Sequence, residues 1–129
     1  MEKEIMGKKH LLTGSILAVT AVGLGAFGAH ALAETLETFG RKDTYDTAVR
    51  YHMFHALAIL FVSILYKNGP HQLLTWTIRF FLSGTLIFSG SLYVLCITNI
   101  TVLGAITPIG GILFIAGWVT LIIYALRHH

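Results

Sequence analysis

Three histidines in apolar surroundings are the residues of this chain whose types and spacing could do chemistry. His52 and His55 are three residues apart, so on a helix they share one face, and His30 lies near the end of the preceding apolar run. Three imidazoles at one level could ligate zinc or copper, and two could ligate haem. They could also donate hydrogen bonds to a quinone or form a proton relay. The chain has no HxH or HExxH pattern, so spacing alone gives a metal site little support.

Hydroxyl groups at a matching depth offer these histidines a structural role instead. If the helices that carry them are antiparallel, Ser91, Tyr93 and Thr107 fall at the same level as the histidines, within about 12 Å of one membrane face. Buried polar groups in a membrane normally satisfy one another across helices. We therefore expect a hydrogen-bonded structural cluster, with a metal, haem or quinone site as the alternative, and we predict no cofactor. His10 and His71 are expected at the membrane interface, and His128 and His129 in a solvated tail.

The elements that must position these side chains follow from composition. Of the 129 residues, 55% are hydrophobic and only 12% are charged, whereas about a quarter of a soluble domain is charged. This excludes a disordered chain and a coiled coil, and the single cysteine, Cys96, excludes an internal disulfide. The net charge of +3 is small, and the basic residues flank apolar blocks, which argues against a nucleic-acid partner.

Four apolar runs are long enough to cross a hydrocarbon core of about 30 Å. We predict an all-α membrane protein with a single integral membrane domain, residues 1–129. Because the connections are short, the helices should form an antiparallel up-down bundle, with spans at about 11–32, 46–66, 75–97 and 102–126. The first apolar run is longer than the apolar region of a signal peptide, so we expect it to be retained.

Local signals refine these four elements. Leu32, Leu36 and Phe39 are spaced for a short interfacial helix, and Asp43 is a candidate N-cap for the second span. Arg50 lies inside that span, and we expect Asp46, four residues earlier, to pair with it; an anion-binding role for Arg50 is the alternative. Proline removes a backbone hydrogen bond, so we expect Pro108 to kink the fourth span.

Small residues predict where helices approach closely. Ala21, Gly25 and Ala29 recur at intervals of four in the first span, and the fourth span contains Gly111 among several glycines. We expect these residues to serve packing within the chain. A homodimer seam along the first span is the alternative.

Lysine and arginine counts predict the orientation. One side collects six basic residues and the other collects three: Lys3, Lys8, Lys9, Lys67, Arg79 and Arg127, against Arg41, Lys42 and Arg50. Since basic residues favour the cytoplasmic side, both termini are predicted to be cytoplasmic.

Four segments together resemble a known family. They are GAFGAHAL at 25–32, TAVRYHMFHAL at 47–57, FSGSLY at 88–93 and ITPIGG at 106–111. The chain resembles uncharacterised protein family 0382, also called domain of unknown function 423, to which eukaryotic transmembrane protein 256 is related. The resemblance runs from about residue 11 to residue 126. It implies a multi-pass protein of a bacterial plasma membrane and brings no established activity.

No catalytic constellation accompanies these elements. The sequence shows no nucleophile with a base in register, no phosphate-binding loop and no paired carboxylates within a span. We therefore predict a non-enzymatic structural or accessory protein of the lipid bilayer, with a homo-oligomer or a membrane-protein partner possible. A histidine-based ligand-binding module is the alternative, and a small transporter or channel subunit is a weaker one.

Overall fold

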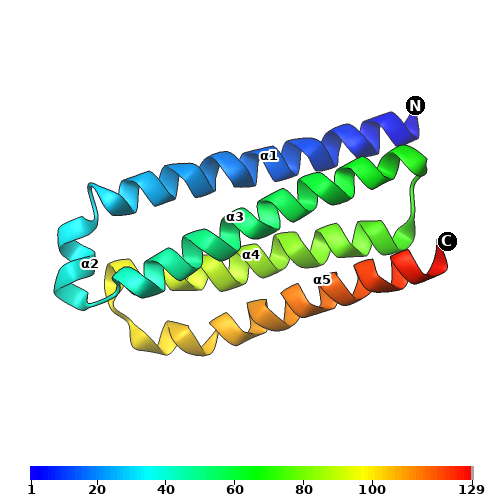
Figure 1. Cartoon of the computed structure of the whole chain (residues 1–129). Coiled ribbons are helices and arrows are strands. Elements are labelled where there is room, and N and C mark those ends of the chain that lie inside the picture. The colour runs from blue at the N-terminus through cyan, green and yellow to red at the C-terminus, as the bar shows by residue number, and fades with distance from the viewer. Residues whose placement is uncertain (129) are drawn as a thin grey trace.

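Helices make up the chain in the computed structural model, which describes residues 1–128. The long helices are α1 (Glu2–Ala29), α3 (Lys42–Leu65), α4 (Gln72–Thr98) and α5 (Thr107–Arg127), and a short helix, α2 (Ala33–Phe39), joins the first two (Figure 1). Two 3-10 turns, η1 (Tyr66–Asn68) and η2 (Thr101–Ala105), lie in the other connections. Four helical segments are long and apolar enough to cross a membrane, which confirms the predicted fold class. His129 lies outside the described residues.

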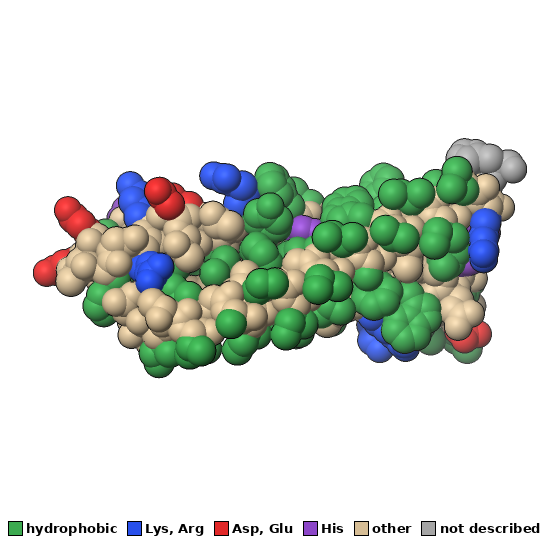
Figure 2. All heavy atoms as spheres, turned by 90° about the horizontal axis from the view of Figure 1, so that it is seen from below, with side chains coloured by type: hydrophobic (Ala, Val, Ile, Leu, Met, Phe, Trp, Pro, Cys, Tyr) green, Lys and Arg blue, Asp and Glu red, His purple; other side chains and the backbone are tan. Residues whose placement is uncertain are grey.

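The four long helices form an open row. α1 packs against α3, α3 against α4, and α4 against α5, while α1 and α5 make no substantial contact with each other. Neighbouring helices run antiparallel, and both termini lie at the same end of the bundle, opposite α2 (Figure 1). Charged side chains lie toward the two ends and hydrophobic side chains cover the middle of the face seen in Figure 2. Each outer helix therefore has a single helix neighbour and a wide apolar face.

The connection at the α2 end is built from two tight helix ends. Gly40 ends α2 with a positive φ of 64°, and the next amide, that of Arg41, donates to the Leu36 carbonyl at 2.9 Å. Asn99 ends α4 in the same left-handed region, with a φ of 56°. The predicted short helix is thus present as α2, with Leu36 buried.

Three local expectations were wrong. Asp43 does not cap α3, because the helix begins at Lys42 and Arg41 is the N-cap, without a side-chain hydrogen bond. Pro108 does not kink a span, since α5 begins at Thr107 and proline in the first helical turn disrupts no hydrogen bond. Among the described residues, Asp46 and Arg50 form no ion pair within 4.0 Å.

The seam between α4 and α5 is a ladder of aromatic and small residues. Its positions on α4 are spaced by four and three in turn, which is the coiled-coil repeat. Each phenylalanine lies against a glycine of the other helix, and a hydroxyl pair closes each end. The rungs are Thr77 with Thr120, Phe81 with Gly117, Gly84 with Phe114, Phe88 with Gly110, and Ser91 with Thr107.

Of the small residues expected to serve packing, some lie at close helix contacts and others do not. Ala21 is fully buried, and a Cβ added at Gly25 would contact Val49 of α3 at 3.3 Å. Ala29 is exposed, and a Cβ at Gly111 would meet nothing within 4 Å. The close approach in α5 falls on Gly110 instead, where an added Cβ would lie 2.7 Å from the Phe88 Cα.

Candidate functional site

His52 connects three helices from the middle of the row. It is 5% exposed, and its Nδ1 lies 2.9 Å from the Tyr93 hydroxyl of α4, while its Nε2 lies 3.1 Å from Thr20 Oγ1 of α1. Thr20 donates its only hydroxyl proton to a carbonyl of its own helix, that of Leu17 at 2.9 Å or Ile16 at 3.0 Å. Thr20 Oγ1 therefore accepts from His52 Nε2–H, and His52 Nδ1 accepts from Tyr93. For a neutral imidazole, these partners therefore place the proton on Nε2.

His55 holds the opposite tautomer one turn later. It is 4% exposed, and its Nδ1 lies 2.8 Å from the Tyr51 carbonyl, which can only accept, so Nδ1 carries the proton. The indole Nε1–H of Trp118 donates to His55 Nε2 at 3.2 Å. The Phe114 ring stacks on the imidazole with centroids 3.6 Å apart and planes 8° from parallel. His55 thus joins α3 to α5 across the intervening α4.

Hydroxyl groups make the remaining links between spans. Ser89 donates to the Ala48 carbonyl at 2.7 Å, and Ser91 and Thr107 share a hydrogen bond of 2.7 Å. Tyr45 donates to the Leu24 carbonyl of α1 at 2.5 Å. Together with the two histidines, these bonds connect every pair of neighbouring long helices, as expected of polar groups that cannot reach water.

His30 is not part of this network. It is exposed at the C-cap of α1, and no side-chain hydrogen bond to it is found. Gly28 packs against Tyr45 near the start of α3, so His30 lies close to that level. His52 lies ten residues into α3, roughly 15 Å deeper. The separation arises because α2 is inserted between the spans, so α1 ends and α3 begins at the surface rather than at the depth of His52.

Two hydrogen-bond partners of the histidines were missed by sequence analysis. Thr20 and Trp118 fall within the first and the fourth predicted span, and neither was given a polar role. Thr20 lies nine residues before the end of α1, and His52 lies ten residues after the start of α3. Counting from the true helix ends would have matched them. Nothing in the sequence pairs Trp118 with His55.

Three further histidines, His10, His71 and His128, lie at the end of the bundle that holds both termini. His10 is 7% exposed and packs on the Tyr66 ring at 4.6 Å, with no hydrogen bond to its Nε2. His71 caps α4 by accepting from the Leu73 amide at 3.1 Å. His128 is exposed and stacks on Tyr124 at 4.3 Å.

A metal centre would need several ligands in one place. Within residues 1–128, no three His, Cys, Asp or Glu side chains come together as a group that could hold a metal ion. Both ring nitrogens of His52 and both of His55 already have partners within the chain. Haem or metal ligation would require these bonds to break.

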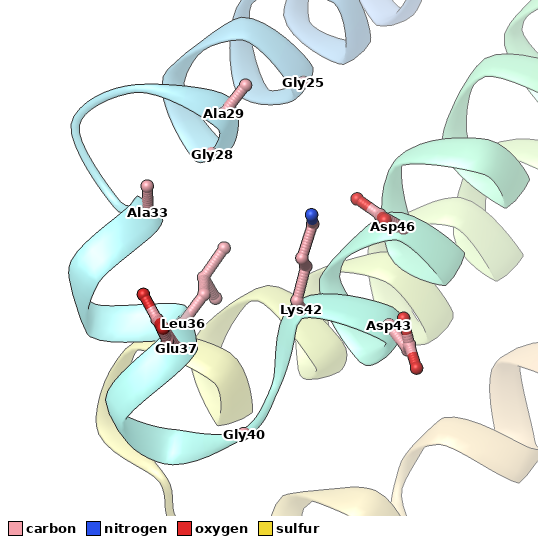
Figure 3. A pocket seen from close by; sticks show the side chains of 10 residues that line it. All are labelled: Gly25, Gly28, Ala29, Ala33, Leu36, Glu37, Gly40, Lys42, Asp43 and Asp46. Carbon is pink, nitrogen blue, oxygen red and sulfur yellow. The ribbon is translucent and has the colours of Figure 1, made fainter.

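A cavity of about 680 Å³ lies near the α2 end, between α1, α2 and α3 (Figure 3). Small residues form one wall, and the side chains of Lys42 and Asp46 point toward the space, whereas Asp43 points away. Its lining is separate from the histidine network: Gly25, Gly28, Ala29, Ala33, Leu36, Glu37, Gly40, Lys42, Asp43 and Asp46.

Comparison with known proteins gives this architecture a family. The model of a protein family of unknown function, DUF423, matches residues 24–111. The UPF0382 membrane protein YwdK of Bacillus subtilis is 39% identical over 94% of this chain and 98% of its own length. The chain belongs to the UPF0382 family. A Staphylococcus aureus UPF0382 membrane protein is 42% identical over 90% of the chain and 93% of its own length.

The UPF0382 assignment extends to a more distant relative. The UPF0382 inner membrane protein YgdD of Escherichia coli is 35% identical over 91% of this chain and 88% of its own length. No solved structure matches the chain. The family is named only as membrane proteins, so the four apolar helices and the family agree on a multi-pass membrane protein of bacteria, and neither indicates an activity.

Proposed function

We propose that this UPF0382 protein is a non-enzymatic structural or accessory protein of the bacterial cell membrane. One observation carries the proposal: each ring nitrogen of His52 and His55 is hydrogen-bonded to another part of the same chain. The groups best suited to ligand chemistry therefore hold the helices together. A catalytic or ligand-binding histidine would keep one nitrogen available for its substrate, metal or proton.

The open row supports the accessory part of the proposal. α1 and α5 each pack against one helix, so each offers its outer face to lipid or to a helix of another protein. The small residues of α1, for which a homodimer seam was the alternative, support the expected packing within the chain: Ala21 is fully buried, and a Cβ at Gly25 would meet Val49 of α3. A partner would use exposed apolar side chains such as Ile112 and Ile115 of α5.

Charge distribution supports an orientation with both termini in the cytoplasm. By their positions in the helices, Lys3, Lys8, Lys9, Lys67, Arg79 and Arg127 belong to the end of the bundle that holds the termini, and Arg41, Lys42 and Arg50 belong to the α2 end. The larger basic count favours the cytoplasmic side.

The test is a ligand analysis of the protein extracted in a mild detergent. We expect no stoichiometric metal, no Soret band and no bound quinone, together with a helical fold that depends on His52 and His55. A stoichiometric ligand that is lost in His55→Ala, while the helices persist, would overturn the proposal in favour of a ligand-binding module.

A further inference from the structure

A groove lies between α3 and α5 beside Arg50, whose side chain is exposed. It has a volume of about 540 Å³ and is lined by Arg50, Tyr51, Phe54, His55, Leu57 and Trp118. Exposed apolar side chains form most of its surface: Phe54 is 56% exposed, Leu57 52% and Trp118 44%. The groove exists because α3 and α5 are not direct neighbours in the row.

Arg50 is the one charged residue of this groove. Its side chain is exposed and makes no hydrogen bond or ion pair with any residue in the described part of the chain. An arginine within an apolar span is costly unless its guanidinium meets an anion or reaches the interface. Arg50 lies one helical turn inside Asp46, so lipid phosphates of the leaflet at the α2 end are the nearest abundant anions.

A second polar group faces the same groove. The Tyr51 ring is fixed by packing against Phe88 at 4.7 Å, and its hydroxyl has no hydrogen-bond partner among residues 1–128. The Trp118 N–H is already donated to His55, which fixes the indole as a wall of the groove. Arg50 and Tyr51 therefore both offer donors to the groove, and the guanidinium fork matches a phosphate.

The order of polarity along the groove matches a phospholipid. Arg50 lies nearer the α2 end, and Leu57 lies seven residues further toward the middle of the bundle, roughly 10 Å away. A lipid in that leaflet presents its phosphate at the first level and its acyl chain at the second. A partner helix would have to bring its own buried carboxylate to Arg50, at a further cost.

We propose that this groove is a binding site for an anionic glycerophospholipid, with the phosphate on Arg50 and Tyr51 and an acyl chain against Phe54, Leu57 and Trp118. The site goes beyond the proposed function and does not depend on it.

The test uses Trp118 as a reporter in vesicles. The chain has two tryptophans, so Trp76→Phe leaves Trp118 alone. Its fluorescence is quenched by brominated phosphatidylglycerol or brominated phosphatidylcholine, each diluted into unbrominated phosphatidylcholine. We expect phosphatidylglycerol to occupy the groove with roughly fivefold preference over phosphatidylcholine, which is the ratio that one basic residue near the membrane surface provides. Adding Arg50→Gln should abolish the preference, and Arg50→Lys should retain part of it.

Arg79→Gln is the matched control. Arg79 is another arginine within a span, and it lies against Trp76 at 5.2 Å on a different part of the bundle, so the preference at Trp118 should remain. Equal quenching by the two lipids, or an unchanged preference in Arg50→Gln, would overturn the proposal. The proposal would also be overturned if neither lipid quenched Trp118 because a co-purifying protein covers it. Far-ultraviolet circular dichroism of each variant checks that it folds.

Discussion

His52 and His55 lie one turn apart on α3 and hold opposite neutral tautomers. His52 carries its proton on Nε2 and donates a hydrogen bond to Thr20 Oγ1. His55 carries its proton on Nδ1 and donates a hydrogen bond to the Tyr51 carbonyl. The other nitrogen of His52 accepts a hydrogen bond from Tyr93, and the other nitrogen of His55 accepts one from Trp118. A single helix face therefore links α3 to α1, α4 and α5 through two imidazoles.

Removing the indole donor should destabilise the bundle. Trp118→Phe keeps an aromatic ring but leaves His55 Nε2 without a partner. We expect the free energy of unfolding to fall by about 0.6–1.7 kcal/mol, from the average to the largest value for hydrogen bonds between membrane helices. Unfolding titrations in mixed micelles measure it. Trp76→Phe removes an exposed indole without such a bond and should change stability by less than about 0.5 kcal/mol.

The two partners of His52 should act as one unit. Thr20→Val and Tyr93→Phe each remove one bond to the imidazole, and each should cost about 1 kcal/mol. The double variant should cost less than the sum, because the network is already broken by the first change. The same micelle titrations give the coupling energy. Tyr124→Phe serves as a control and should leave stability unchanged. If the costs of Thr20→Val and Tyr93→Phe add fully in the double variant, His52 does not couple the two helices.

Substitution by alanine should affect stability differently at two adjacent glycines, Gly110 and Gly111. A Cβ at Gly110 would press on the Phe88 backbone, whereas one at Gly111 meets nothing within 4 Å. Gly110→Ala should lower the free energy of unfolding by about 1–3 kcal/mol, the usual cost of overpacking. Gly111→Ala should be neutral or slightly stabilising, because alanine favours the helix. If the two variants changed the free energy of unfolding equally, the packing of Gly110 against Phe88 in the α4–α5 seam would be contradicted.

The orientation can be read by cysteine labelling. Cys96 is fully buried and is replaced first, by Cys96→Ser. Thr38→Cys on α2 should then react with a membrane-impermeant maleimide in cells whose outer barrier, if present, is permeabilised, and His128→Cys should react only after lysis. Labelling of residue 128 in intact cells would reverse the assignment.

The spans, their antiparallel order and most network members follow from the sequence. Long uncharged runs force helices in a bilayer, and short connections make neighbours antiparallel. His52, Tyr93, Ser91 and Thr107 were recognised because polar side chains inside an apolar run need partners at their own depth.

Depth arguments failed where a helix end was misplaced. His30 was assigned the depth of His52 because the first span was extended to residue 32 and the second was begun at about residue 46, whereas α1 ends at Ala29 and α3 begins at Lys42. The Trp118–His55 bond depends on α3 and α5 approaching across α4, and no local pattern encodes that long-range geometry. The choice of Gly110 over Gly111 depends likewise on the rotation of α5 about its axis.

The central claim is that the buried histidines are structural and neutral. Nitrogen-15 NMR of histidine-labelled protein in lipid bilayers at neutral pH reads the tautomer of each ring, with His52→Asn and His55→Asn assigning the signals. We predict a proton on Nε2 of His52 and on Nδ1 of His55, both unchanged when zinc is added. Two rings in the same tautomer, a doubly protonated ring, or a zinc-dependent shift at either residue would contradict the account.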